Sequence, residues 1–200
     1  MINFHNVDCM DFMESISDKA YDLAIVDPPY GLEKSSTHGR GKLKNRIINL
    51  ENIHKWDNAP GEEYFRELFR VSKNQIIWGG NYFHLPPSRC VLVWDKVQPW
   101  ENFSQVEIAW TSYVLPAKLY RFDNRRGGKI HPTQKPVELY SWILSKFKEK
   151  KILDTHGGSM SIALACHDFG RDLDICEIDK KYFDAGKARY EEHISQGRLF

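Results

Sequence analysis

The chain has 200 residues, of which 42% are apolar, so it is long enough for one compact domain and too short for a second full domain. Its 28 basic and 27 acidic residues give a net charge of +1, which neither requires nor excludes a nucleic-acid partner, because binding depends on where basic residues cluster. No apolar run reaches bilayer-spanning length and residues 1–6 lack a secretory signal pattern, so we expect a single cytoplasmic domain over residues 1–200.

Short apolar runs alternate with segments of helical period, which predicts an α/β fold with helices on both faces of a sheet. The strands that we expect are Ile2–Phe4, Leu23–Val26, Gln75–Trp78, Val91–Trp94, Val106–Thr111, Lys151–Leu153 and Asp174–Cys176. The expected helices are Glu62–Val71, one with Pro136 in its first turn, one that follows Ser159, and one from about Asp179 towards Ser195.

The segment Asp27-Pro28-Pro29-Tyr30 directly follows the strand Leu23–Val26, at the carboxyl end of a strand, where α/β sheets bind ligands. Consecutive prolines fix the backbone and leave carbonyl oxygens without competing local donors, and Asp27 adds a carboxylate. These acceptors suit an NH2 group on an aromatic ring, because hydrogen bonds from both amino hydrogens localise the nitrogen lone pair for attack. The Tyr30 ring offers a face for a base taken out of its stack. The alternative is a proline turn in which Asp27 caps a nearby group.

Two stretches, residues 31–60 and 116–131, fit neither the helical nor the strand period, and both are rich in Lys and Arg. Long loops in a compact domain are usually binding loops or lids, or else disordered. Basic side chains can hold phosphates, and Asn or Arg side chains can read base edges. We therefore expect the two stretches to contact DNA, with solvated surface charge as the alternative.

The strand Lys151–Leu153 runs into a loop of small residues, Asp154-Thr155-His156-Gly157-Gly158-Ser159, which leads into a helix. Such loops let the backbone approach a ligand closely, and the start of a helix offers free amide donors. Asp154 can accept a hydrogen bond from a ligand amine. The pattern Gly-x-Gly-x-x-Gly is absent, which argues against a cofactor with a pyrophosphate.

Glu177 stands 23 residues after Asp154, at the end of the next apolar strand. An acidic residue at this separation suits the hydroxyl groups of a ribose. The alternative is a carboxylate at a helix N-terminus, since Asp179 opens a helix. Beside the small-residue loop, we favour the ribose role.

The cysteines and histidines show no spacing typical of a metal site, so we predict no bound metal and free thiols at Cys9, Cys90, Cys166 and Cys176. No Pro-Cys pair occurs in the sequence. The cysteine of such a pair is the usual nucleophile of enzymes that methylate carbon 5 of cytosine, so the sequence argues against that class of enzyme.

Together these segments resemble the DNA amino-methyltransferases of the N6-adenine and N4-cytosine family. Residues 27–30 are similar to the catalytic motif of the family, and residues 154–161 to its cofactor loop. The catalytic motif comes first, as in the circularly permuted beta class, and His131–Pro136 is similar to the segment before the helix that precedes the cofactor strand. The resemblance implies a Rossmann-like, three-layer methyltransferase domain. Its mixed seven-stranded sheet would have the order 3-2-1-4-5-7-6, with strand 3 near Ile2–Phe4.

The resemblance also implies the cofactor S-adenosyl-L-methionine, with Asp8 at its adenine and Lys135 near its methionine carboxylate. Direct methyl transfer to a base flipped out of double-stranded DNA is implied, and Asp in the motif favours adenine N6 over cytosine N4. The expected catalytic residues are Asp27, Pro28, Pro29 and Tyr30. The expected cofactor contacts are Asp8, Cys9, Asp27, Lys135, Asp154, Thr155, His156, Gly157, Gly158, Ser159, Glu177 and Ile178.

One residue departs from the family pattern, because Met160 stands where the loop commonly has a second glycine. A side chain at this position predicts a reshaped loop or weaker cofactor binding. A DNA-binding relative with impaired cofactor binding therefore stays open, as does N4-cytosine methylation. Methylation of RNA or of a protein amide is a further alternative, although those relatives usually carry Asn in place of Asp27. A homodimer and a partner restriction enzyme in a restriction–modification pair also stay open.

Overall fold

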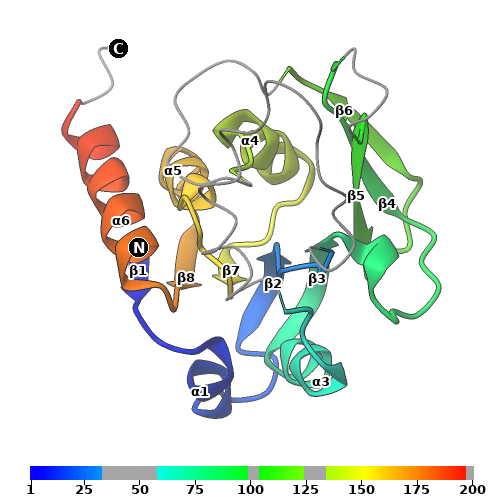
Figure 1. The fold of residues 1–200 in the computed structure, drawn as a ribbon, viewed down its shortest axis with the longest axis horizontal. Coiled ribbons are helices and arrows are strands. Elements are labelled where there is room, and N and C mark those ends of the chain that lie inside the picture. The colour runs from blue at the N-terminus through cyan, green and yellow to red at the C-terminus, as the bar shows by residue number, and fades with distance from the viewer. Residues whose placement is uncertain (33–57, 99–103, 124–133, 197–200) are drawn as a thin grey trace, which may run out of the picture.

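The structure is a computed structural model that describes residues 1–32, 58–98, 104–123 and 134–196 (Figure 1). Most of the two predicted DNA-contacting stretches, residues 33–57 and 124–131, therefore lies outside the described residues. The same holds for residues 131–133 of the segment before the cofactor strand. Across the described ranges, no helix has the length and apolar character needed to span a bilayer.

Strands and helices alternate along the chain, as the sequence predicts. The strands are β1 (Ile2–His5), β2 (Tyr21–Val26), β3 (Ser72–Trp78), β4 (Val91–Asp95), β5 (Val106–Thr111), β6 (Lys118–Arg121), β7 (Lys151–Asp154) and β8 (Asp172–Cys176). The helices are α1 (Cys9–Glu14), α3 (Glu62–Val71), α4 (Val137–Lys146), α5 (Ser161–Asp168) and α6 (Lys180–Ser195), with a short 3-10 turn, η3 (Gly80–Tyr82).

The strands form one mixed sheet in the order β1-β8-β7-β2-β3-β5-β4-β6. Strands β1, β8, β7, β2 and β3 are parallel, β5 runs antiparallel to both β3 and β4, and β6 is parallel to β4. The first seven positions agree with the expected order 3-2-1-4-5-7-6, and β1 takes the edge position of strand 3 as predicted. The predicted mixed α/β fold is confirmed.

The expected strand number is wrong, because the sheet has eight strands. The additional strand, β6, lies inside the stretch 116–131, where we expected a loop. Four residues are too few for a periodicity signal, and the strand pairs only with β4, at the sheet edge. Its pairing with a distant strand, rather than its own sequence, therefore makes it a strand.

Two details of the helices also differ from the prediction. Pro136 is the N-cap of α4 rather than a residue of its first turn. Helix α1 was not expected, because six residues carry too little periodicity to predict a helix. Its start is fixed by the Asp8 carboxylate, which accepts a hydrogen bond of 2.8 Å from the Met10 N–H as an N-cap.

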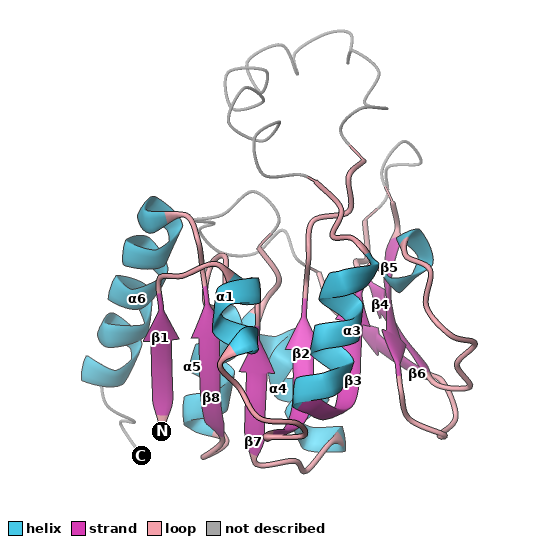
Figure 2. Ribbon diagram, turned by 90° about the horizontal axis from the view of Figure 1, so that it is seen from below, coloured by secondary structure: helices cyan, strands magenta, loops and turns pink. Residues whose placement is uncertain are grey.

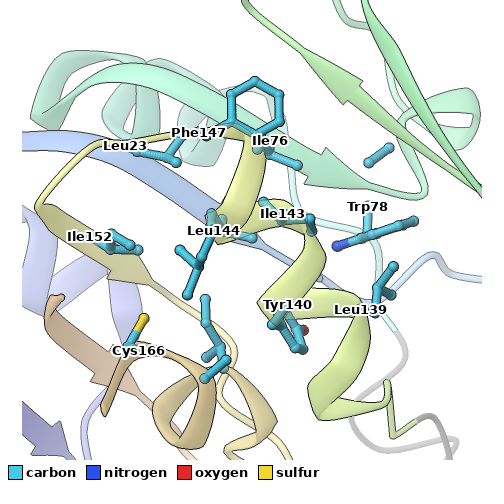
Figure 3. Close-up of a cluster of buried hydrophobic side chains, with 14 of the residues drawn as sticks. Leu23, Ile76, Trp78, Leu139, Tyr140, Ile143, Leu144, Phe147, Ile152 and Cys166 are labelled. Atoms are coloured by element: carbon cyan, nitrogen blue, oxygen red, sulfur yellow. The ribbon is translucent and has the colours of Figure 1, made fainter. Parts of the chain in front are cut away.

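Helices cover both faces of the sheet and give three layers (Figure 1). Helices α4 and α5 pack on one face, where the buried side chains of α4 meet those of β2, β3 and β7 (Figure 3). Helices α1 and α3 cover the other face over a second apolar cluster. Each buried Leu or Ile contributes roughly 1.5–3 kcal/mol, so the two clusters fix the sheet firmly between the helix layers.

Strands β1, β8, β7, β2 and β3 end at the same edge of the sheet, because they are parallel (Figure 2). The loops after these five strands therefore meet in space, although they come from segments up to about 170 residues apart. Every predicted catalytic residue lies in one of these loops. The sheet topology thus determines where the candidate site forms.

Candidate active site

The Asp27 carboxylate emerges from the end of β2 and has two side-chain partners. The Tyr30 hydroxyl donates to Asp27 Oδ1 at 2.6 Å, and the Lys135 ammonium forms an ion pair with Oδ2. Lys135 arrives from the segment before α4, more than 100 residues further along the chain. The predicted catalytic acid is therefore held by a tyrosine of its own motif and a lysine from a remote one.

Lys135 is only 4% exposed, yet it keeps its charge because two carboxylates surround it. Its second partner is Glu107 of β5, with Nζ and Oε2 3.2 Å apart, and Glu107 also pairs with Lys96. Burial lowers the pKa of Lys135, but Asp27 and Glu107 outweigh burial and raise it above the ordinary value. Burial likewise raises the pKa of Glu107, and Lys135 and Lys96 bring it below the ordinary value.

The Tyr30 ring lies against the backbone of Gly79, at the end of β3. A side chain at Gly79 would place its Cβ 2.2 Å from Tyr30 Cε1, and Gly79 has a φ of +68°. Only glycine fits both the contact and the left-handed backbone. Tyr30 also stacks on Tyr82 of η3, with ring centroids 5.1 Å apart. The ring of the catalytic motif therefore has a fixed place beside Asp27.

A cleft of about 110 Å³ opens at the ends of β1, β7 and β8. Its lining contains six of the predicted cofactor contacts and one neighbour: Val7, Asp8, Cys9, Thr155, His156, Glu177 and Ile178. The cleft thus brings together three segments that are widely separated in the sequence. Lys135, Asp27, Asp154 and the residues 157–159 are not part of this lining. The predicted cofactor contacts stay predictions both for these residues and for those in the lining.

Glu177 reaches across to the small-residue loop. Its Oε2 accepts the Gly158 N–H at 2.7 Å, and its Oε1 accepts the Asp179 N–H at 2.8 Å. Each carboxylate oxygen has a second lone pair, so Glu177 can orient the loop and still accept from a hydroxyl group in the cleft. Burial raises the pKa of Glu177 above its ordinary value.

Asp154 lies beneath the loop and is 3% exposed. Its Oδ1 accepts the His156 N–H at 3.0 Å. Burial raises the pKa of Asp154 to about 8, and the neighbouring charges of Asp27 and Glu177 act in the same direction. Asp154 is therefore protonated at neutral pH in the absence of a bound cation, and an ammonium group placed next to it would ionise it.

Met160 holds the left-handed backbone that the family pattern reserves for glycine, with a φ of +56°. Its side chain is fully buried against Gly157 of the loop and Gly186 of α6, and Met160 is not part of the cleft lining. A Cβ at Gly186 would lie 2.2 Å from Met160 Cγ, so the helix leaves room for the methionine by having glycine there. The reshaped loop or weaker cofactor binding that the sequence suggested at Met160 stays a prediction.

The sequence analysis did not identify two residues that contact the candidate site residues, Glu107 and Tyr64. Glu107 stands as one acid inside the apolar strand β5, which is a weak signal for a buried ion pair. Tyr64 belongs to α3, and its hydroxyl lies 2.6 Å from Thr155 Oγ1, but its position in a helical stripe carries no such signal.

Comparison with known proteins identifies relatives over nearly the whole chain. A family model described as DNA methylase, for N6 and N4 methyltransferases, matches residues 90–188. The Type II methyltransferase M2.MboI of Moraxella bovis is 26% identical, over 95% of this chain and 88% of its own. The Type II methyltransferase M.HpaI of Haemophilus parainfluenzae is 24% identical, over 92% of this chain and 72% of its own.

Solved structures share the fold. TTHA0409 of Thermus thermophilus, complexed with S-adenosyl-L-methionine, has a TM-score of 0.61 at 15% identity, covering 100% of this chain and 96% of its own. The complex of M1.HpyAVI with the same compound has a TM-score of 0.60 at 19% identity, covering 94% of this chain and 98% of its own. The cytosine-N4-specific PvuII DNA methyltransferase has a TM-score of 0.60 at 14% identity, covering 97% of this chain and 90% of its own.

Proposed function

Because the chain belongs to the DNA amino-methyltransferase family, we propose that it transfers the methyl group of S-adenosyl-L-methionine to the N6 amino group of adenine in double-stranded DNA. The observation that carries this proposal is the Asp27 carboxylate, which stands at the end of β2 and is oriented by Tyr30 and Lys135.

Asp27 acts as the acceptor for one hydrogen of the target amino group. Each of its oxygens has a lone pair left beyond the bonds to Tyr30 and Lys135, so the amino group can add without displacing them. A carbonyl oxygen of the proline pair accepts the other amino hydrogen. The nitrogen lone pair would then be localised for direct attack on the methyl group, without a covalent enzyme intermediate. The N–C bond would form as the sulfonium S–C bond breaks, S-adenosylhomocysteine would leave, and the nitrogen would release one proton to Asp27 or to water.

The residues of the cleft fit the nucleoside part of S-adenosyl-L-methionine. Asp8 and Glu177 provide carboxylate acceptors for amino and hydroxyl groups, and Ile178 provides an apolar contact. The bound cofactor supplies an electrophilic methyl group on a sulfonium. Asp154, buried at the end of β7, is suited to accept from the amino group of its methionine part, and Lys135 to attract its carboxylate.

Loss of cofactor binding through Met160 is the rival interpretation. The buried Met160 side chain packs against Gly186 and is not part of the cleft lining, so it takes no space from a ligand in the cleft. This favours an active enzyme over a relative that only binds DNA.

On the DNA side, we propose that the target adenine flips out of the duplex towards Asp27 and Tyr30. Flipping costs a few kcal/mol, which phosphate contacts and stacking must offset. The basic residues of 31–60 and 116–131 are the proposed phosphate contacts, of which Lys118 and Arg121 are described, on the edge strand β6.

The decisive experiment is the transfer of a labelled methyl group to unmethylated DNA, followed by digestion and identification of the nucleoside. We expect N6-methyl-2′-deoxyadenosine as the product. Asp27→Ala should lower the rate by about 100-fold or more, because it removes a preorganised acceptor. Asp184→Ala on α6, which removes a carboxylate that is 58% exposed, is the matched control and should keep the wild-type rate.

Two outcomes would change the conclusion. N4-methyl-2′-deoxycytidine as the product would make cytosine the target base, as named for the PvuII methyltransferase, and leave the chemistry at Asp27 unchanged. Full transfer by Asp27→Ala would remove Asp27 from the mechanism.

A further inference from the structure

A chain of hydrogen bonds runs from α3 to the wall of the cleft. Tyr64 Oη lies 2.6 Å from Thr155 Oγ1, and Thr155 Oγ1 lies 2.9 Å from His156 Nδ1. The rings of Tyr64 and His156 also meet edge to face, with centroids 5.4 Å apart. The His156 imidazole is therefore held at Nδ1 by Thr155, which in turn is held by Tyr64.

The buried phenol sets the direction of these bonds. Tyr64 is 4% exposed, and burial raises its pKa well above the ordinary value, so its hydroxyl keeps its proton. Among the described residues, Thr155 Oγ1 is the one acceptor recorded for that proton. The opposite direction would leave the phenol proton unpaired in the interior, at a cost of about 1–3 kcal/mol. Tyr64 therefore donates to Thr155, and Thr155 donates to His156 Nδ1.

Since Nδ1 of His156 accepts a hydrogen bond, the hydrogen of a neutral imidazole must be on Nε2. Burial lowers the pKa of His156 to about 4, against a smaller opposing effect of Asp8, so the ring is neutral at neutral pH. A neutral imidazole with an accepting Nδ1 carries its hydrogen on Nε2. No protein partner of Nε2 is recorded within the described ranges, and His156 belongs to the lining of the cleft.

The other groups of the lining make this N–H distinctive. Asp8 and Glu177 contribute carboxylate acceptors. The Thr155 hydroxyl is used by His156, and burial raises the pKa of the Cys9 thiol to about 12, which leaves a weak S–H donor. Among the described residues of the lining, the His156 imidazole is therefore the one side chain with a strong hydrogen-bond donor left for a ligand. The carboxylates beside it are acceptors.

We propose that the His156 Nε2–H reads the ligand of the cleft by donating to an acceptor atom of the nucleoside, a purine ring nitrogen or a ribose oxygen. Tyr64 and Thr155 are positioning residues that fix this tautomer. The inference rests on the proposed function, in which the cleft takes the nucleoside part of S-adenosyl-L-methionine.

Calorimetric titration with S-adenosylhomocysteine tests the donor. His156→Phe keeps a flat ring without the N–H and should weaken binding about tenfold. His156→Gln can place an amide N–H near the position of Nε2 and should stay closer to wild type than His156→Phe does. His167→Phe, on the exposed face of α5, is the matched control and should bind as wild type does. Equal affinity of His156→Phe and wild type overturns the proposal.

Nitrogen-15 NMR of the imidazole tests the tautomer without any ligand. We expect the Nε2–H form in the wild-type protein and a mixture of tautomers in Tyr64→Phe, which removes only the hydroxyl group. A wild-type ring with its hydrogen on Nδ1 contradicts the direction of the chain and overturns the proposal.

Ligand analogues identify the acceptor. The analogues are S-adenosylhomocysteine with one ring nitrogen replaced by carbon, and its deoxyribose forms. The analogue that lacks the acceptor should bind about tenfold more weakly to wild type and lose nothing further with His156→Phe. Independent losses for every analogue overturn the proposal. Absence of any binding by wild type and by His167→Phe would instead refute the proposed function itself, and the donor role with it.

Discussion

At the scale of single residues, the molecule places a buried cation between two acids. Lys135 is shared by Asp27 and Glu107, and all three come from different parts of the chain. Taking such charges out of water is costly, so each is tolerated only because its partners stay in place. The cluster therefore acts as one unit that holds the Asp27 carboxylate, the proposed catalytic acceptor.

Removal of the Lys135 charge alone should lower the stability of the fold more than removal of Lys135 together with the charge of Glu107. Lys135→Met leaves the Asp27 carboxylate without its cation and Glu107 with Lys96 alone, and it should cost about 3–5 kcal/mol of unfolding free energy, measured by urea denaturation. Glu107→Gln combined with Lys135→Met should cost less than Lys135→Met alone. Lys146→Met, at the exposed end of α4, serves as the control. Additive losses would show that the three groups are not coupled.

Asp154 gives the free protein a defined pH dependence. Its pKa of about 8 lies above that of an unfolded aspartate, so between pH 6.5 and 8 the folded state holds a proton that the unfolded state has lost. Stability should therefore fall as the pH rises through this window, by at most about 1.4 kcal/mol per unit. Below pH 6.5 the low pKa of His156 acts in the opposite direction, because the unfolded histidine takes up a proton first.

The comparison of wild type with Asp154→Asn measures this effect. Thermal unfolding from pH 6.5 to 8 should give a declining stability in wild type and a flatter profile in the variant. Asp184→Asn, on the exposed side of α6, should decline as wild type does. A decline of the same size in Asp154→Asn would mean that other groups titrate in this range.

At the scale of elements, α6 and the cofactor loop are matched to each other. Met160 fills the space that Gly186 leaves, and the loop keeps its left-handed turn despite a side chain there. Glycine inside a helix is normally unfavourable by about 1 kcal/mol relative to alanine. The close contact with Met160 explains why α6 has a glycine at position 186.

A double-mutant cycle tests this match. Gly186→Ala in the wild-type background should destabilise the protein by about 1–3 kcal/mol, because the new methyl group overlaps Met160. In a Met160→Gly background the same substitution should cost less, because the overlap with Met160 is gone, alanine favours the helix, and a tight contact of 3.3 Å with the Gly158 carbonyl oxygen is left. Urea denaturation gives the four free energies. Equal effects of Gly186→Ala in both backgrounds would disprove the match.

At the scale of the whole molecule, the cleft joins the first, the seventh and the eighth strand. A ligand that bridges these loops binds only the folded chain, so it stabilises the fold by mass action. At a concentration of about 100 times its dissociation constant, S-adenosyl-L-methionine should add about 2.7 kcal/mol and raise the melting temperature.

The melting-temperature shift separates the cleft from the catalytic cluster. Glu177→Ala should lose most of the shift, because it removes an acceptor in the cleft and the bond to Gly158. Glu107→Gln, outside the cleft lining, should keep the shift even where the variant itself melts at a lower temperature. No shift in wild type at saturating ligand would contradict cofactor binding in this cleft.

The sequence alone determined the fold class and the position of the site along the chain. Apolar runs with strand period, such as Leu23–Val26, specify buried strands locally, and residues that directly follow them lie at the sheet edge by geometry. The Asp27 motif, the loop after β7 and Glu177 could be placed in this way. Their roles in binding and catalysis stay predictions.

Only the tertiary structure decided which remote residues meet. The ion pairs of Lys135, the strand β6 and the bond from Tyr64 to Thr155 each join segments far apart in the chain. The fit of Met160 against Gly186 is likewise a contact across 26 residues of sequence. Periodicity reports how a segment presents its own faces to the interior. Periodicity does not indicate which residues a buried face will contact, because those contacts depend on how the completed sheet and its helices bring distant segments together.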